Sequence, residues 1–252
     1  MRVLVTFALS QEFAPWRALR TFRRVEFLGV PVQAASMGGL QVHVLLTGMG
    51  PERAVNAVRT AFANEYHMCI STGLAGGLKN LHPTGRVLVA RTVRAGIGDE
   101  FIATDSRLRR LAAICGARVV DAFYSSERIL VRAREKASLA LLADAVEMES
   151  FGIMDEARKW RVPAIAVRAI SDAAGEDLPF DFNRAISRKG GISIPRVLVA
   201  LARQPKKIHD LLRLGRESRR AATKLAAFLD SYLETLAGLS HEESSLTQKV
   251  TG

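Results

Sequence analysis

The chain has 252 residues, 48% of them hydrophobic, and a formal net charge of +11 at pH 7. This length and composition can bury a sizeable core without disulfides or structural metal, and no apolar run is long enough to span a membrane. Cys69 and Cys115 are far apart in apolar surroundings, so we expect reduced thiols, as in a cytoplasmic protein. The first predicted strand begins at Arg2, which leaves no room for a signal peptide, and the cysteines and histidines show no metal-ligand spacing. We expect neither a metal nor a cofactor.

Strands and helices are predicted to alternate along the chain. Apolar runs predict strands at residues 2–8, 25–36, 40–47, 68–72, 86–93 and 118–124, and helical periodicity predicts helices at residues 13–24, 105–115 and 134–143. Residues 48–50 and 73–77 are predicted to be glycine-rich turns after strands, and Pro51 opens a further helix.

Two segments near the middle of the chain are the most informative. Residues 145–150 and 167–172 both read as buried strands that end in carboxylates, with a helical segment at residues 151–161 between them. A strand–helix–strand unit predicts that the two strands lie parallel. Glu149 and Asp172 would then emerge at the carboxyl ends of parallel strands, where ligands bind in open α/β sheets. The alternative is that both acids only cap helices.

The alternation, with an antiparallel meander near its start, predicts an α/β fold with a mixed, mostly parallel sheet wrapped by helices over residues 1–194. Residues 195–239 form a basic amphipathic helical tail, broken at Pro205 and at Gly215, and the polar residues 240–252 are expected to be disordered. Three interpretations of the tail remain open: a solvated helix packed on the core, which is the default, contact with an anionic membrane, and nucleic-acid binding. Nucleic acid is the least favoured because no aromatic residues are interleaved for stacking.

A family resemblance rests on residues 146–149 (Val-Glu-Met-Glu), 168–172 (Arg-Ala-Ile-Ser-Asp) and 71–77 (Ser-Thr-Gly-Leu-Ala-Gly-Gly). Together they resemble the purine nucleoside phosphorylase and nucleosidase superfamily, and within it the 5′-methylthioadenosine/S-adenosylhomocysteine nucleosidases. The similarity covers roughly residues 1–193. It implies a partly barrel-like sheet, a nucleoside substrate, a homo-oligomer and a catalytic glutamate at Glu12.

The resemblance also implies how the leaving base and the sugar are handled. Asp172 would be the general acid that protonates the departing base, which requires a carboxyl held neutral near pH 7, and Ser171 would orient it. Glu149 would accept hydrogen bonds from the ribose hydroxyls and place negative charge near the ribosyl cation. Met148 would pack against the sugar, whereas Glu147 would make a structural or ribose-side contact.

The nucleophile is implied by the same motifs. Glu12 and Arg168 would position and activate a water, with the guanidinium keeping Glu12 ionised. Phosphorylases of this superfamily carry an arginine and a serine at the positions held here by Ser71 and Leu74. Neither residue supplies a charge for phosphate, and leucine supplies no side-chain donor, so hydrolysis is favoured over phosphorolysis.

Substrate recognition is predicted from four further residues. Ile129 stands where the superfamily stacks an aromatic ring on the base, Phe180 and Phe182 would line the pocket for the 5′ substituent, and Gly76 would allow backbone to approach the ligand. The predicted substrate is an adenine nucleoside with an apolar 5′ group. The basic tail and a hopanoid-pathway member of the superfamily suggest a lipid-linked nucleoside such as adenosylhopane. A non-catalytic nucleoside-binding protein is the competing class.

Overall fold

The computed structural model describes residues 1–96, 100–187, 190–203 and 205–250. The strands are β1 (Arg2–Phe7), β2 (Arg23–Phe27), β3 (Val30–Met37), β4 (Leu40–Leu46), β5 (Met68–Gly77), β6 (Val87–Ala95), β7 (Phe101–Ala103), β8 (Arg118–Ser125), β9 (Ala145–Glu147) and β10 (Ala164–Asp172). The α-helices are α1 (Ser10–Leu19), α2 (Pro51–Phe62), α3 (Ser106–Ile114), α4 (Ala133–Leu139), α5 (Ser150–Lys159), α6 (Ile194–Arg203) and α7 (Ile208–Val250). Two 3₁₀ turns complete the list, η1 (Phe182–Ala185) and η2 (Pro205–Lys207).

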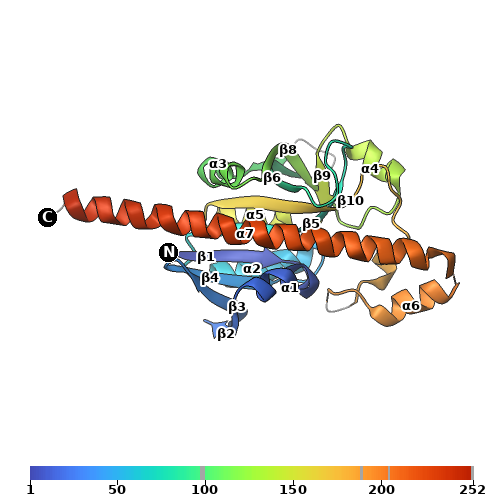
Figure 1. The fold of residues 1–252 in the computed structure, drawn as a ribbon, viewed down its shortest axis with the longest axis horizontal. Coiled ribbons are helices and arrows are strands. Elements are labelled where there is room, and N and C mark those ends of the chain that lie inside the picture. The colour runs from blue at the N-terminus through green and yellow to red at the C-terminus, as the bar shows by residue number, and fades with distance from the viewer. Residues whose placement is uncertain (97–99, 188–189, 204, 251–252) are drawn as a thin grey trace.

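The strands form one mixed sheet that closes partly into a barrel. The path β10-β6-β8-β9-β5 returns to its start because β5 also pairs with β10, and β1, β4, β3 and β2 extend the sheet from β5. The pairings of β1 with β4, of β5 with β1 and β10, and of β8 with β6 and β9 are parallel. The helices pack around this sheet (Figure 1). The predicted fold class is confirmed.

The direction of β9 differs from the prediction. β10 runs parallel to β5, whereas β9 runs antiparallel to β5, so β9 and β10 do not lie parallel to each other and that prediction is wrong. The physical reason is the closure of the sheet. The strands that α5 connects, β9 and β10, both pair with β5 and lie on opposite sides of it, so they are not neighbours in a simple parallel unit. Gly76 is the point where they meet: it pairs with Val146 of β9 and with Asp172 of β10. The carboxyl ends of β9 and β10 therefore lie close together because both strands pair with β5, and not because they are parallel neighbours.

The second glycine-rich segment is also a correction, because residues 73–77 are the last part of β5 and not a turn. These glycines leave room for carboxyl groups. A Cβ on Gly76 would lie 3.1 Å from Oδ2 of Asp172, and one on Gly73 (φ +147°) would lie 3.1 Å from Oε1 of Glu12. Side chains at either position would therefore crowd the acids beside the strand.

Elements near the amino terminus are shorter than predicted. The first helix ends at Leu19 and is followed by β2, and residues 25–36 are divided between β2 and β3 by a turn at Leu28 and Gly29, both with positive φ. β3 and β4 pair antiparallel, as the sequence predicts.

The carboxyl-terminal segment is more deeply packed than a tail. The helix breaks at Pro205, but Gly215 lies inside α7, which runs along the whole molecule (red in Figure 1) and continues to Val250 where disorder is predicted. Apolar residues at helical spacing, including Leu225, Leu229 and Leu233, are fully buried in the same core as β1, β4 and β5. From Ala221 to Ala237, α7 is therefore a core helix of the fold.

Candidate active site

A cavity of about 240 Å³ opens at the end of β5 and collects most of the predicted site residues. Those that line it are Glu12, Gly76, Ile129, Glu147, Met148, Glu149, Ser171, Asp172 and Phe182. In the described part of the chain, Arg168 and Phe180 are not among the lining residues. The lining also includes Lys136, which the sequence did not single out.

Glu12 is fixed by the start of α1. As the third residue of that helix, its carboxylate reaches back and Oε2 accepts the N–H of Leu9 at 3.0 Å, while Oε1 accepts the N–H of Leu74 on β5 at 3.0 Å. Burial raises the pKa of Glu12 above its ordinary value, although these N–H donors and the charge of Arg168 act in the opposite direction. The charge of Arg168 favours the ionised form of Glu12, but burial has the larger effect on its pKa. A raised pKa suits a general base that works near neutral pH.

Glu149 lies across the cavity, immediately before α5. Its Oε1 accepts the N–H of Gly50 at 2.9 Å, at the turn that leads into α2. Burial, and then repulsion from Glu147, raise the pKa of Glu149 to about 8. At a pKa of about 8, Glu149 is largely protonated at pH 7, and a cation that develops beside it would favour the ionised form.

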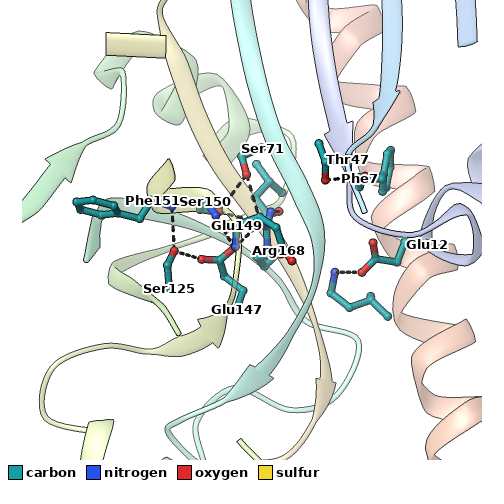
Figure 2. A network of polar contacts seen from close by, with 12 residues as sticks. Phe7, Glu12, Thr47, Ser71, Ser125, Glu147, Glu149, Ser150, Phe151 and Arg168 are labelled. Atoms are coloured by element: carbon teal, nitrogen blue, oxygen red, sulfur yellow. Dashed lines mark hydrogen bonds and ion pairs between the residues drawn. The ribbon is translucent and has the colours of Figure 1, made fainter. Parts of the chain in front are cut away.

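Glu147 and Arg168 form a buried ion pair behind the cavity (Figure 2). Arg168 Nη2 donates to Oε2 of Glu147 at 2.6 Å and to the hydroxyls of Ser150 and Ser71 at 2.8 and 3.2 Å. Glu147 Oε2 also accepts the N–H groups of Glu149 and Ser150, so it caps the first turn of α5. These contacts fit the structural role predicted for Glu147. Because Glu147 also lines the cavity, its predicted ribose-side contact stays a prediction.

Arg168 does not reach the predicted partner. Figure 2 shows Glu12 and the Arg168–Glu147 network on opposite sides of the cyan strand β5, and the partners of the guanidinium are Glu147, Ser150, Ser71 and the carbonyl of Val167. Arg168 is 1% exposed. Arg168 therefore positions Glu147 and α5 and acts on Glu12 only through its charge.

Asp172 is held by a hydroxyl and an ammonium. Ser171 Oγ donates to Oδ1 at 2.7 Å, and Lys136 Nζ donates to Oδ2. The same ammonium donates to the carbonyls of Ala173 and Glu176 at 2.9 and 3.1 Å, and Lys136 is 1% exposed. A fully buried lysine is retained only with such partners. Little in the sequence marks Lys136 as a site residue. It lies one helical turn before Leu139 and Ala140, where an isolated lysine is usually solvent-exposed.

The remaining predicted residues form the wall of the cavity. Asn183 of η1 clamps Ile129: its Oδ1 accepts the Ile129 N–H at 2.8 Å and its Nδ2 donates to the Ile129 carbonyl at 2.9 Å. Phe182 lines the cavity and contacts Phe180 edge to face, with ring centroids 5.4 Å apart. Phe180 therefore supports Phe182 from outside, and an apolar wall faces the cavity at this end.

The cations at the cavity are already paired. Among the described lining residues these are Arg128, which donates to Glu135 at 2.5 Å, and Lys136, which is bound to Asp172. Within the described residues, no group of three His, Cys, Asp or Glu could hold a metal ion. The described residues also contain no helix long and apolar enough to cross a membrane.

Comparison with known proteins identifies the fold. Residues 117–203 match the family model described as the Phosphorylase superfamily. The 5′-methylthioadenosine/S-adenosylhomocysteine nucleosidase of Neisseria meningitidis, solved with methylthio-immucillin-A, is similar at TM-score 0.71 and 20% identity, over 93% of this chain and 99% of that one. The corresponding enzyme of Campylobacter jejuni gives TM-score 0.70 and 18% identity over 93% and 99%. Futalosine hydrolase of Helicobacter pylori strain 26695 gives TM-score 0.70 and 18% identity over 93% and 98%.

The chain has the fold of these solved structures. Residues 1–193 are only about three quarters of the chain, so a match over 93% of it extends into α7. The limit that the sequence placed on the resemblance is therefore wrong. The physical reason is the buried face of α7, which lies in the same core as β1, β4 and β5.

Proposed function

We propose that the chain hydrolyses the N-glycosidic bond of a purine nucleoside that carries a 5′ substituent, and so releases the free base. The observation that supports this most strongly is the convergence of three carboxyl groups, Glu12, Glu149 and Asp172, on one cavity. Each carboxyl has different partners, and two have raised pKa values, so the three can take separate roles.

Departure of the base is assigned to Asp172 with Lys136. A purine leaves as a poor, anionic group unless a ring nitrogen is protonated as the glycosidic bond breaks. Asp172 would deliver this proton, and the Lys136 ammonium bound to Oδ2 would supply it, leaving a neutral amine beside a carboxylate. Ser171 holds the other carboxylate oxygen, which keeps the group aimed into the cavity.

The sugar is assigned to Glu149 and Met148. Ribose hydroxyls would donate to Glu149, whose ionised form is favoured as positive charge develops on the ribosyl ring. Met148 lines the same cavity and would pack against the sugar. The N–H of Gly50 already fixes one oxygen of Glu149, so the carboxyl does not have to reorganise during the reaction.

Water as the nucleophile is supported by the contacts of Glu12. The Leu74 N–H, a backbone donor that a phosphate could use, is occupied by the carboxylate of Glu12. A negative charge at this position repels phosphate, whereas a carboxyl of raised pKa can accept a proton from water. Phosphorolysis remains the alternative reaction, and a nucleoside-binding protein without activity the alternative class.

The substrate is proposed to be an adenine nucleoside with an apolar 5′ group. Phe182 and Ile129 give the cavity an apolar wall, and the similar nucleosidase structures contain ligands with methylthio and butylthio groups. A lipid-linked nucleoside such as adenosylhopane, in hopanoid biosynthesis, fits the same wall. We further propose a homodimer that works in the cytoplasm without a cofactor.

The test is release of free base from a panel of adenine and other purine nucleosides, with and without phosphate. Release that does not depend on phosphate is expected. Release only with phosphate would establish phosphorolysis, and binding without release from any member of the panel would leave a binding protein.

A further inference from the structure

The outer face of α6 is apolar although it lies in solvent. Ile194, Leu198 and Val199 are 62%, 59% and 55% exposed, whereas Val197 turns inward and is 8% exposed. α6 packs mainly against the short turns η1 and η2 and projects from the body of the molecule (Figure 1). A helix that turns its most apolar side to water is typical of a docking element.

The same surface continues onto the first turns of α7. Ile208 and Leu212 are 45% and 61% exposed and lie one helical turn apart. Cations surround these apolar residues: residues 194–220 contain eight Lys and Arg against two acids. The described basic side chains of this region that are at least partly exposed are Arg196, Lys206, Lys207, Arg213, Arg216, Arg219 and Arg220.

The opposite side of α7 reaches the active-site cavity. Leu214 and Ser218 line that cavity, as does Ile192, two residues before α6. The apolar and basic surface of α6, η2 and the start of α7 therefore borders the cavity through the same helix. A partner bound there would contact the same helix that lines the cavity.

We propose that α6, η2 and residues 208–220 dock the protein on an anionic membrane surface. The apolar residues Ile194, Leu198, Val199 and Leu212 would enter the interface, and the lysines and arginines would contact lipid headgroups. The charge of the surface favours an anionic membrane over a second copy of the chain. A second copy, also of net charge +11, would place the same cations opposite one another, and they would repel. The buried part of α7, from Ala221 on, takes no part in docking.

If the proposed function holds, docking on a membrane also favours one class of substrate, nucleosides that are anchored in the bilayer. With the cavity beside the bilayer, a nucleoside anchored in the membrane by a long apolar 5′ group could pass its head into the site while the chain stays in lipid. The enzyme would then act on amphiphilic nucleosides without removing them from the membrane.

Docking is measured by flotation of the full chain with phosphatidylcholine vesicles, with and without phosphatidylglycerol, at low and high salt. The parent is expected to bind only the anionic vesicles and to be released by salt, because exposed charges are screened beyond about 10 Å at 0.1 M. Leu198→Asp, and the double variant Lys206→Glu/Lys207→Glu, should each bind at least about tenfold more weakly.

Matched controls separate a specific surface from general charge. Ile114→Asp changes an apolar residue at the end of α3 that is 80% exposed, more than Leu198 at 59%. Arg23→Glu/Arg24→Glu makes on β2 the same change of net charge as the double lysine variant. Both should bind as the parent does. Val199→Asp provides a second substitution on α6 if Leu198→Asp does not show the parent's melting transition.

Three results would overturn the proposal: no binding of the parent to anionic vesicles at low salt, an equal loss in the β2 control, or a Leu198→Asp variant that loses only self-association in size-exclusion chromatography. Hydrolysis of soluble nucleosides, assayed separately, tests the proposed function alone. If that function holds, Leu198→Asp should keep the soluble activity and lose hydrolysis of a vesicle-embedded 5′-alkyl adenine nucleoside. Equal hydrolysis of the embedded nucleoside by parent and variant would overturn the substrate consequence.

Discussion

At the scale of single residues, the pair formed by Asp172 and Lys136 decides how the site can move a proton. The carboxylate lies between the Ser171 hydroxyl and a lysine ammonium that is itself buried. Because Lys136 donates directly to Asp172, the geometry provides a pair of groups and not a lone general acid. The two groups together hold one transferable proton.

Asp172→Asn should lower the rate of base release by ~10²–10⁴-fold while nucleoside binding is largely kept, because the proton can no longer be delivered. Lys136→Gln should lower the rate of base release by a similar factor. The double variant should be no slower than the slower single variant, since the two residues act as one unit. Single-turnover base release measures this, and ligand titration measures binding. Multiplied losses in the double variant would show that the two groups act separately.

Glu149 carries a consequence for pH. Its folded-state pKa of about 8 lies above the ordinary value of 4.5, so between these pH values the folded protein keeps a proton that the unfolded chain has released. Stability from this group is therefore present at low pH and is lost as the pH rises through about 8. Glu149→Gln should melt at a higher temperature than the parent at pH 8–9, with a smaller difference at pH 5.

The melting temperature across this pH range checks the prediction. The control is Glu26→Gln, which changes an exposed carboxyl on β2 and should leave the parent's profile unchanged. Parallel profiles for Glu149→Gln and the parent would show that Glu149 is not held protonated. Glu12 also has a raised pKa, so it should contribute to the dependence of the melting temperature on pH in both the parent and the Glu149→Gln variant.

At the scale of elements, β5 is the strand on which the site depends. It pairs with β1, β9 and β10, and its glycines give the carboxyl groups of Glu12 and Asp172 room beside the backbone. The sequence shows the glycines but not the reason for them, because the neighbouring acids come from α1 and β10.

Gly76→Ala should therefore impair catalysis more than folding. The added methyl would lie 3.1 Å from Oδ2 of Asp172 and 3.3 Å from Cγ1 of Val146, so the acid has to move. We expect base release to fall, but by less than the about 10²-fold that an ångström-scale misplacement costs, because the neighbours have to move by only a few tenths of an ångström. The control, Gly215→Ala in α7, meets nothing within 4 Å and should stabilise the helix by about 1 kcal/mol. Full activity of a folded Gly76→Ala protein would contradict this role.

At the scale of the whole molecule, α7 joins the two ends of the chain. Its buried face packs against β1, β4 and β5, and Asp230 accepts from Arg20 at 2.7 and 2.9 Å beside α1. α1 in turn carries Glu12, so the carboxyl-terminal helix supports the helix that presents the Glu12 carboxyl to the cavity.

Leu229→Ala should lower the free energy of unfolding by about 2–5 kcal/mol, since the side chain is fully buried in the main core. Leu239→Ala, on the same helix but 46% exposed, should change it by less than about 0.5 kcal/mol. Urea denaturation of both variants measures the difference. Equal stabilities would mean that α7 is a dispensable tail.

The sequence by itself determined the local features of this protein: the alternation of strands and helices, and the acids at positions 12, 149 and 172 that follow strands. These features depend on residues close together in the chain, which periodicity and motif spacing report. Only the tertiary structure decided the direction of β9, the contacts of Arg168 with Glu147, the place of Lys136 beside Asp172, and the burial of α7. Each of these depends on closure of the sheet, which brings together residues far apart in the sequence, and no local pattern encodes which distant partner a side chain meets.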